Sequence, residues 1–516
     1  GLYPWQDGVY SNSDSLKDED LPVTPLPELF RQAGYQTAGF GKTHWRRTIP
    51  STRGFEVRAI SEPRNSIAYE GGALMMTDDN LPGFKEYNAE VKDYGPGEEG
   101  VKGYIGGTSK VDPANHRDGW VAAQCLKFLD QGIDPQRPLF LYLSFMKPHA
   151  GFNVPKEFED LYDINTIPDT PQPPWSKESD THLAAYDAAE QSGTRYAEWH
   201  AAWEKMTPIE RRRTTLRYYA NCSWLDAYFG QVMDKLKTLG RLDNALIVFT
   251  ADHGEMLAER NFRFSKYCLF DSSVRVPLIL AGSVIPEQKR GTIDDRPAEH
   301  IDLVPTLVRA AGQPVNPLLP GLDLLGEQRR AGSFAEFHGG DAVRPLVAPA
   351  YMWRKADWKL ILFLPGRLDG AAARSALAKG ELYDLKDDPH EWKNLYGDEK
   401  FAALREQMKT ELLMHLACVW SRGPVSPERP RGPAAQGAVL GFELEDILWI
   451  ARTFDLEVVD HLVSGRQVLR HDVRGHGRHL LAVELLDLPL RRQDQLEPHV
   501  LEREVEVRDE RGAVEV

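Results

Sequence analysis

Polar residues that could bind an anion or a metal follow several apolar segments of this chain. Asp252 and His253 come directly after the apolar segment Asn244–Thr250. A carboxylate oxygen and an imidazole nitrogen are both ligands for divalent cations, so the pair could form half of a metal site. A turn in which acidic side chains cap a helix explains an isolated Asp-His-Gly-Glu equally well.

Lys42 and His44 lie on a glycine-containing loop that follows residues 35–40, a predicted strand. Alternate residues of one loop can face the same cavity. There Lys42 would supply a positive charge for an anion, and His44 would exchange a proton near neutral pH. A solvated surface loop is the alternative interpretation, and it is the commoner one for such a pair alone.

Two more candidates follow the same arrangement. His149 comes after Lys147 and Pro148, at the end of the predicted strand 138–145, and the proline restricts the loop that carries the imidazole. Lys266 lies between the Asp-His pair and residues 274–280, which are again predicted to form a strand. A structural histidine and a solvated lysine are the ordinary alternatives for these two residues.

The segments that must position these residues predict an α/β fold. The predicted strands are continuous apolar runs, as parallel strands covered on both faces require. Predicted helices at residues 24–34, with Thr24 as N-cap, and at 120–129 and 216–239 alternate with them. We therefore expect a large, mostly parallel sheet sandwiched by helices, with its ligands at the carboxyl ends of the strands.

A smaller region and an unusual tail follow. Residues 331–420 contain predicted antiparallel strands at 351–354, 358–363 and 381–385 and a helix at 398–416, which indicates a C-terminal α+β subdomain. We thus predict domains at 1–330 and 331–420, with a tail at 421–516. From Gly423 onward the tail has no Lys, Tyr, Asn, Cys or Met. Its composition favours out-of-frame translation of a gene end over a genuine accessory segment.

Composition excludes several classes of protein. The 516 residues carry a formal net charge of −15, which argues against a nucleic-acid-binding protein but leaves room for a local basic pocket. The sequence has no apolar run of 18 residues, so no transmembrane segment is predicted. The four cysteines are far apart and form no Cys-x-x-Cys, so neither a zinc ribbon nor a disulfide framework is expected.

The order and spacing of these motifs resemble the sulfatase family. The segment 34–44 is similar to the second sulfatase signature. The block from Asn244 through the Asp-His-Gly-Glu motif to Lys266 and residues 276–279 is similar to the family's metal and sulfate block. Residues 300–307 match a later helix of the family, and residues 381–391 resemble its C-terminal subdomain. The resemblance covers residues 1 to about 420.

The resemblance implies an alkaline-phosphatase-like fold and a sulfuric ester hydrolase with a formylglycine nucleophile and calcium. Asp252 and His253 would then bind the metal. Lys42 and Lys266 would bind sulfate oxygens, with Lys266 also assisting the leaving oxygen. His44 would take a proton from the formylglycine hydrate, and His149 would hydrogen-bond the sulfate ester. The substrate would be a sulfated small molecule or carbohydrate, and a periplasmic or secreted location would be expected.

One departure from the family pattern is large. The family makes formylglycine from the first residue of a Cys/Ser-x-Pro-x-Arg motif, and neither this motif nor the family's early pair of aspartates is present. We therefore expect a chain truncated just downstream of the nucleophile and, as such, inactive. Two alternatives remain open. One is a phosphonate monoester or phosphodiester hydrolase of the same superfamily, with Mn²⁺ or Mg²⁺. The other is a catalytically dead anion-binding homologue.

Two aromatic residues beside the predicted loops leave the substrate undefined. Trp45 and Phe152 could stack on a sugar or aryl ring, or they could belong to the core.

Overall fold

The computed structural model describes residues 1–10, 16–45, 52–61, 73–76, 85, 90, 100–101, 106–175, 203–264, 266, 268–338, 349–363, 380–420, 457–463, 466–472, 507–509 and 512–514. The chain divides into two compact units, residues 1–440 and 441–516. Among the described residues, no helix is long and apolar enough to cross a membrane.

One of the two four-stranded sheets of the first unit is parallel, as predicted. Its strand order is β3-β2-β1-β6, formed by Leu74–Met75, Val57–Ile60, Gln36–Gly41 and Leu139–Ser144. Every neighbouring pair runs parallel, and β1 pairs with β6 over its full length, from Gln36 opposite Leu139 to Gly41 opposite Ser144. The carboxyl ends of β1 and β6 therefore meet at one edge of the sheet.

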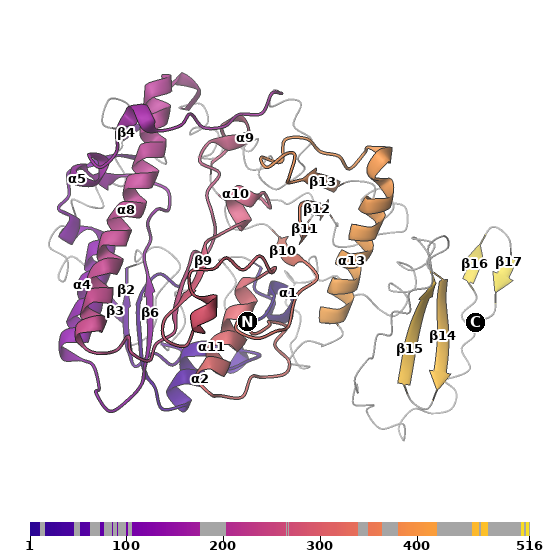
Figure 1. Ribbon diagram of the computed structural model, residues 1–516, viewed down its shortest axis with the longest axis horizontal. Helices are drawn as coiled ribbons and strands as arrows, with labels where there is room; N and C mark the ends of the chain where they lie inside the picture. The colour runs from indigo at the N-terminus through magenta and orange to yellow at the C-terminus, as the bar shows by residue number, and fades with distance from the viewer. Residues whose placement is uncertain are drawn as a thin grey trace. The chain divides into compact units, whose positions relative to one another are not determined.

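Helices cover both faces of this sheet (Figure 1). On one face, α4 (Arg117–Gln131) packs against β1 and against the long helix α8 (Pro208–Thr238). Their shared core includes Phe40, Trp120 and Leu129. On the other face, α2 (Leu26–Gln32) lies on β1, and Phe30 stacks on Phe140 with ring centroids 4.4 Å apart. The prediction of a sheet sandwiched by helices is confirmed.

The predicted strands at 244–250 and 274–280 differ from expectation. They form β8 (Ile247–Thr250) and β9 (Leu278–Ala281), which pair with each other in antiparallel orientation as a separate two-stranded ribbon. We predicted fully buried strands, but Phe249 is 44% exposed and Ile279 is 55% exposed. Every residue of β6 is also only partly buried. Among the described residues, one edge of β6 and one edge of β8 have no strand beside them, which leaves these apolar runs incompletely covered.

The C-terminal part of the first unit is an antiparallel sheet, as predicted. Its order is β10-β11-β12-β13, formed by Ser333–Phe337, Ala350–Lys355, Trp358–Phe363 and Gly380–Asp384. Helix α13 (Ala402–Trp420) packs on β11 and β12. Figure 1 shows this sheet between α13 and the short helix α10 (Asp271–Val274). The domain boundaries at residues 330 and 420 stay predictions.

The predicted helices begin at other residues than expected: α4 begins at Arg117 instead of 120, and α13 begins at Ala402 instead of 398. Helix α2 begins at Leu26 with Pro25 at its N-cap, one residue later than the predicted cap at Thr24. Helix α8 begins at Pro208 instead of 216, because Thr207 and Glu210 form a capping box ahead of it.

Short elements complete the first unit. The helices are α1 (Pro4–Asp7), α5 (Lys156–Glu159), α9 (Glu259–Phe262), α10 (Asp271–Val274) and α11 (Leu303–Ala310), and the strands are β4 (Gly100–Val101), β5 (Gly106–Ser109) and β7 (Val154–Pro155). The second unit contains two antiparallel hairpins, β14 (Glu457–Val463) with β15 (Arg466–Asp472), and β16 (Val507–Asp509) with β17 (Gly512–Val514). Whether the tail is a genuine accessory segment stays open.

Candidate active site

The loop after β1 brings Lys42 to the end of β8. The Lys42 side chain is buried, and its Nζ donates a hydrogen bond to Asp252 Oδ2 at 2.6 Å. Gly41 makes this placement possible, because its φ is 95° and a Cβ there would lie 1.7 Å from the Ser144 carbonyl oxygen. A side chain at this position would therefore separate β1 from β6 just where the site begins.

The side chains of Asp252 and His253 lie close to each other. His253 Nε2 lies 3.4 Å from Asp252 Oδ2, and the backbone N–H of His253 donates to Asp252 Oδ1 at 3.1 Å. The other ring nitrogen, Nδ1, lies 2.8 Å from the Gly254 carbonyl oxygen, which suits a protonated Nδ1 that donates to it. In that tautomer Nε2 carries the free lone pair on the side of the carboxylate.

Lys266 meets His149 from the opposite side. Lys266 Nζ lies 2.9 Å from His149 Nε2, and the rings of His149 and His253 have centroids 6.2 Å apart. Two lysines, two histidines and one carboxylate therefore converge from the loops that follow β1, β6 and β8. These loops follow the carboxyl ends of the strands, where open α/β sheets bind their ligands.

Burial keeps both histidines of the cluster neutral. Burial lowers the pKa of His149 well below its usual value, and the nearby Lys266 and Lys42 lower it further. Burial and Lys266 together lower the pKa of His253 to about 4. At neutral pH both imidazoles therefore offer lone pairs, as a metal ligand or a hydrogen-bond acceptor must.

Lys42 lowers the pKa of both Lys266 and Asp252. Burial lowers the pKa of Lys266 to about 8, and the positive charge of Lys42 acts in the same direction. Lys266 is thus still mostly protonated at pH 7 but can release its proton to a developing anion. For Asp252, burial would raise the pKa, but Lys42 and His253 outweigh burial and lower it.

A buried aspartate organises the loop that carries His149. Asp118, at the start of α4, is 0% exposed, and its carboxylate accepts hydrogen bonds from the backbone N–H groups of Met146 (2.6 Å) and Lys147 (3.3 Å). The buried Lys147 Nζ donates to Asn153 Oδ1 at 2.7 Å and also contacts the Gly151 carbonyl oxygen. The loop around His149 is therefore held at both of its ends.

The segment 268–273, which we call the anchor segment, holds the other two loops. Ser273 Oγ donates to the Lys266 carbonyl oxygen at 2.7 Å, and the Ser273 carbonyl oxygen accepts from the Gly254 N–H at 2.7 Å. A Cβ at Gly254 would lie 2.1 Å from the Ser272 carbonyl oxygen, so this close approach requires glycine. Lys266 and the Asp-His pair are thus tied to one short segment.

The structure joins five of the six predicted site residues by these contacts: Lys42, His149, Asp252, His253 and Lys266. His44 lies two residues beyond Lys42 with a φ of 55°, and its catalytic role stays a prediction. The two aromatic candidates, Phe152 and Trp45, lie in different surroundings. Phe152 belongs to a buried core cluster with Trp203 and Phe264, whereas Trp45 stacks on Phe55 at 6.1 Å.

The donor atoms of Asp252 and His253 fit one cation. Their separation of 3.4 Å is close to the distance between adjacent ligands of a cation whose bonds are about 2.3 to 2.6 Å long. Among the described residues, no group of three or more His, Cys, Asp or Glu side chains forms a metal site. The pair therefore fits as part of a coordination shell and not as a complete one.

The residues that support this cluster were not predicted from the sequence. Asp118, Ser273 and, on the C-terminal sheet, Lys359 were not among the predicted site residues, and each orders a loop of the site or the anchor segment. The sequence did contain an indication for Lys359, because it is a charged residue within the apolar run Trp358–Phe363. In the structure its side chain is 0% exposed. Such a residue is expected to be buried with partners.

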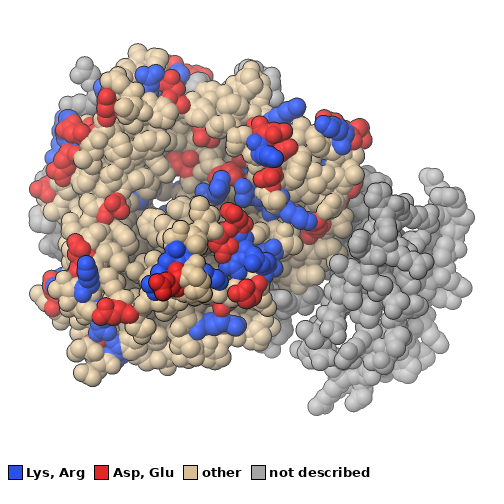
Figure 2. Space-filling view, viewed as in Figure 1, with Lys and Arg blue, Asp and Glu red and all other residues tan. Residues whose placement is uncertain are grey.

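Positive charge at the site is a local feature. Basic and acidic side chains are interspersed over the face drawn in Figure 2, and the whole chain is acidic with a formal net charge of −15. The buried Lys42 and the partly buried Lys266 therefore place positive charge here against the overall charge of the protein.

Comparison with known proteins gives two family-model matches and several curated relatives. The family model described as Sulfatase matches residues 1–313, and the model for the C-terminal region of N-sulphoglucosamine sulphohydrolase matches residues 259–417. The chain is 25% identical over 430 residues to an arylsulfatase of Clostridium perfringens, covering 81% of each chain. It is 27% identical over 478 residues to a choline-sulfatase of Rhizobium meliloti, covering 89% of this chain and 77% of that one.

A solved structure shares the fold. The phosphonate monoester hydrolase from Silicibacter pomeroyi superposes with a TM-score of 0.62 at 21% identity, covering 81% of this chain and 84% of that chain. At this identity the likeness concerns the fold alone. The family model covers more than half of the residues, and the site it spans has the charge and the donor atoms described above. The chain belongs to the sulfatase family.

Proposed function

We propose that this chain forms the body of a sulfuric ester hydrolase that acts on a sulfated small molecule or carbohydrate. The observation that supports this most directly is the convergence of Lys42 and Lys266 with two neutral histidines on the Asp252 carboxylate. A sulfate ester carries its charge on nonbridging oxygens and develops more on the leaving oxygen. Two preorganised ammonium groups suit both charges.

Each residue has a distinct role in this proposal. Lys42 binds a nonbridging sulfate oxygen from its buried position. Lys266 binds a second oxygen and, with a pKa of about 8, donates a proton toward the leaving oxygen. His149 accepts a hydrogen bond from Lys266 and orients it. His44, two residues beyond Lys42, acts as a base that removes a proton when sulfate is released.

A divalent metal completes the site in this proposal. Asp252 and His253 would hold it, and when bound it would supply positive charge to the sulfate oxygens. Ca²⁺ suits the carboxylate oxygen, whereas the His253 nitrogen also suits Mn²⁺ or, less well, Mg²⁺. Two donors are fewer than the six to eight that calcium takes, so further ligands must come from other residues or from water.

The nucleophile comes from outside the described cluster. Residues 1–516 contain no Cys/Ser-x-Pro-x-Arg motif, so in this proposal the formylglycine belongs to a polypeptide segment that these residues do not include. Residues 1–516 alone then bind inorganic sulfate but do not turn over a sulfate ester.

The second candidate is a phosphonate monoester hydrolase. The nitrogen donor of His253 favours it, and the phosphonate monoester hydrolase from Silicibacter pomeroyi shows that this fold can carry that activity. The test is to assay the product of the complete gene with 4-nitrophenyl sulfate and with 4-nitrophenyl phenylphosphonate. A higher kcat/KM for the sulfate supports our proposal, and a much higher value for the phosphonate overturns it. Sulfate binding without turnover of either ester would indicate an anion-binding homologue.

A further inference from the structure

A buried lysine of the C-terminal sheet contacts the anchor segment. Lys359 lies on β12 and is 0% exposed. Its Nζ donates to the Leu269 carbonyl oxygen at 3.2 Å and lies 2.6 Å from Glu391 Oε1, and it also contacts the Asp271 carboxylate. A fully buried ammonium group is tolerated because these three oxygens replace its water shell.

The partners of Lys359 come from two segments that are far apart in the sequence. Leu269 and Asp271 belong to the anchor segment, whereas Glu391 belongs to the turn after β13. The backbone N–H of Asp271 donates to Glu391 Oε2 at 2.6 Å, so the two segments are also bonded directly. Glu391 thus bridges the ammonium group and the anchor segment.

Arg260 also joins the anchor segment to the turn that carries Glu391. Its guanidinium lies 4.0 Å from the ring centroid of Phe270, and it contacts the Glu391 carbonyl oxygen. A cation placed over an aromatic face in a buried position is stabilised by the ring's charge distribution. Charged groups therefore contact three consecutive residues of the anchor segment: Lys359 contacts Leu269 and Asp271, and Arg260 contacts Phe270.

The other end of the anchor segment reaches the site. Ser273 binds the Lys266 carbonyl oxygen and the Gly254 N–H, each at 2.7 Å, and the Cys268 N–H donates to the Lys266 carbonyl oxygen at 2.8 Å. A short series of bonded groups thus runs from Lys359, through the anchor segment, to Lys266 and to the residue after His253.

We propose that Lys359 is a positioning residue for the active site. Its ammonium group, held by Asp271 and Glu391, fixes the anchor segment, and the anchor segment fixes the backbone of Lys266 so that Nζ stays beside His149. The C-terminal subdomain thereby sets the geometry of the anion site without contacting the anion. The inference rests on the proposed function only for its consequence in sulfate binding.

The test compares Lys359→Met with Lys355→Met. Lys355 is a matched control, because it lies on the neighbouring strand β11 and pairs with Glu411 at 2.6 Å, away from the anchor segment. Two quantities are measured: the ¹⁵N imidazole chemical shifts of His149, with selective histidine labelling, and the affinity for inorganic sulfate by calorimetry. We expect Lys359→Met to change the His149 shifts and to weaken sulfate binding at least tenfold, and Lys355→Met to change neither.

Two outcomes overturn the inference. One is a folded Lys359→Met protein whose His149 shifts equal those of the unchanged chain, and the other is an equal effect of both methionine variants. If Lys359→Met does not fold, Asp271→Asn decides, since it removes the charge on the anchor segment and keeps the Lys359–Glu391 pair. Altered His149 shifts in Asp271→Asn support the inference, and unaltered shifts refute it.

The same measurements separate the two proposals. If the unchanged chain binds no sulfate but the variant still alters the His149 shifts, the proposed function fails and the positioning role stands. If sulfate binds equally well to the unchanged chain and to a folded Lys359→Met protein with unaltered shifts, the positioning role fails and the proposed function stands.

Discussion

The amine of Lys266 lies 2.9 Å from Nε2 of His149, and the two groups cannot both carry a full positive charge at that distance without strong repulsion. The neutral imidazole accepts, and the ammonium group donates. This division of roles keeps the positive charge on Lys266, which an anion at the site would require.

Replacing Lys266 by methionine should weaken sulfate binding about 30- to 100-fold, because one of the two lysine charges at the site is lost. The pKa of His149 should rise in the same variant, since Lys266 is the nearest cation that lowers it. Calorimetry and an NMR titration of labelled histidine measure the two effects. Lys386→Met, at an exposed turn residue, is the control and should change neither quantity. Unchanged sulfate affinity in Lys266→Met would exclude Lys266 from the site.

Sulfate affinity should depend on pH through Lys266. Burial and Lys42 lower the pKa of this amine to about 8, so the charged form that binds the anion persists below that pH and is lost above it. Affinity should therefore be constant from pH 6 to about pH 7 and fall as pH rises through about 8. In Lys266→Arg the fall should disappear, because the guanidinium keeps its proton. A fall of equal size and position in both proteins would contradict the assignment.

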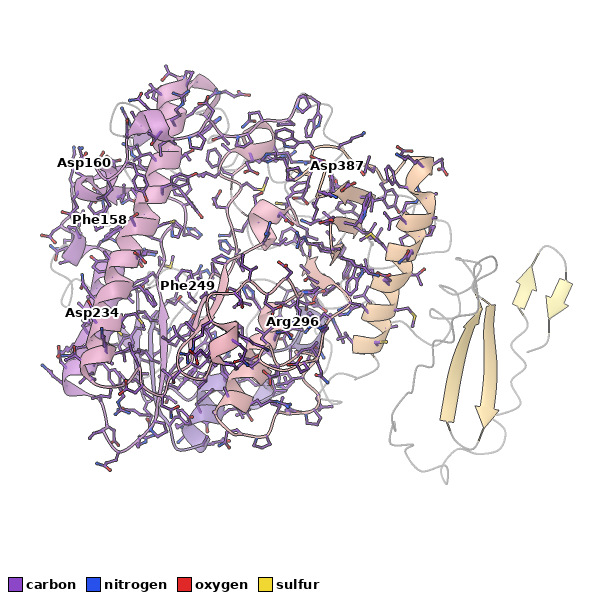
Figure 3. All side chains as sticks on the ribbon, viewed as in Figure 1. Phe158, Asp160, Asp234, Phe249, Arg296 and Asp387 are labelled. Atoms are coloured by element: carbon purple, nitrogen blue, oxygen red, sulfur yellow. The ribbon has the colours of Figure 1, made fainter. Side chains whose placement is uncertain are left out.

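Metal binding should depend on Asp252. Asp252→Asn removes the charged oxygen that lies 3.4 Å from His253 Nε2, and we expect it to weaken Ca²⁺ binding at least tenfold. Calorimetry with Ca²⁺ and with Mn²⁺ measures the effect. Asp387→Asn, an exposed residue labelled in Figure 3, should bind metal as the unchanged chain does. Equal affinities of Asp252→Asn and Asp387→Asn would remove Asp252 from the metal site.

Two glycine substitutions should have opposite effects on stability. In Gly254→Ala the new Cβ would lie 2.1 Å from the Ser272 carbonyl oxygen, so the site loop or the anchor segment must move. We expect a loss of about 1 to 3 kcal/mol in the free energy of unfolding. Gly230→Ala lies within α8, where the Cβ would meet nothing within 4 Å, and should gain about 0.5 to 1 kcal/mol. Urea unfolding of both variants checks the pair, and a neutral Gly254→Ala would refute the close approach.

The sequence was sufficient to predict the parts of the site that follow strands. Apolar runs of the right length located β1, β6 and β8, and the polar residues at their carboxyl ends form the observed cluster. These features are local, because one short stretch of sequence sets both the strand and the loop after it.

Contacts between distant segments could not be predicted in this way. The contact of Lys359 with Asp271 joins residues that no periodicity connects, and so does the bond from Asp118 to the loop before His149. The antiparallel pairing of β8 with β9 was missed for a related reason. Apolar composition indicates that a strand is buried, but it does not indicate which strand or helix buries it.

The open edges of β6 and β8 have a practical consequence for anyone who purifies this chain. Among the described residues, each strand has one side without a neighbouring strand, and Phe249 on β8 (Figure 3) and Ile279 beside it are about half exposed. Such an edge is a template for pairing with another molecule. Residues 1–516 should therefore self-associate as their concentration increases, and a charged substitution such as Phe249→Lys should keep the protein monomeric in light scattering.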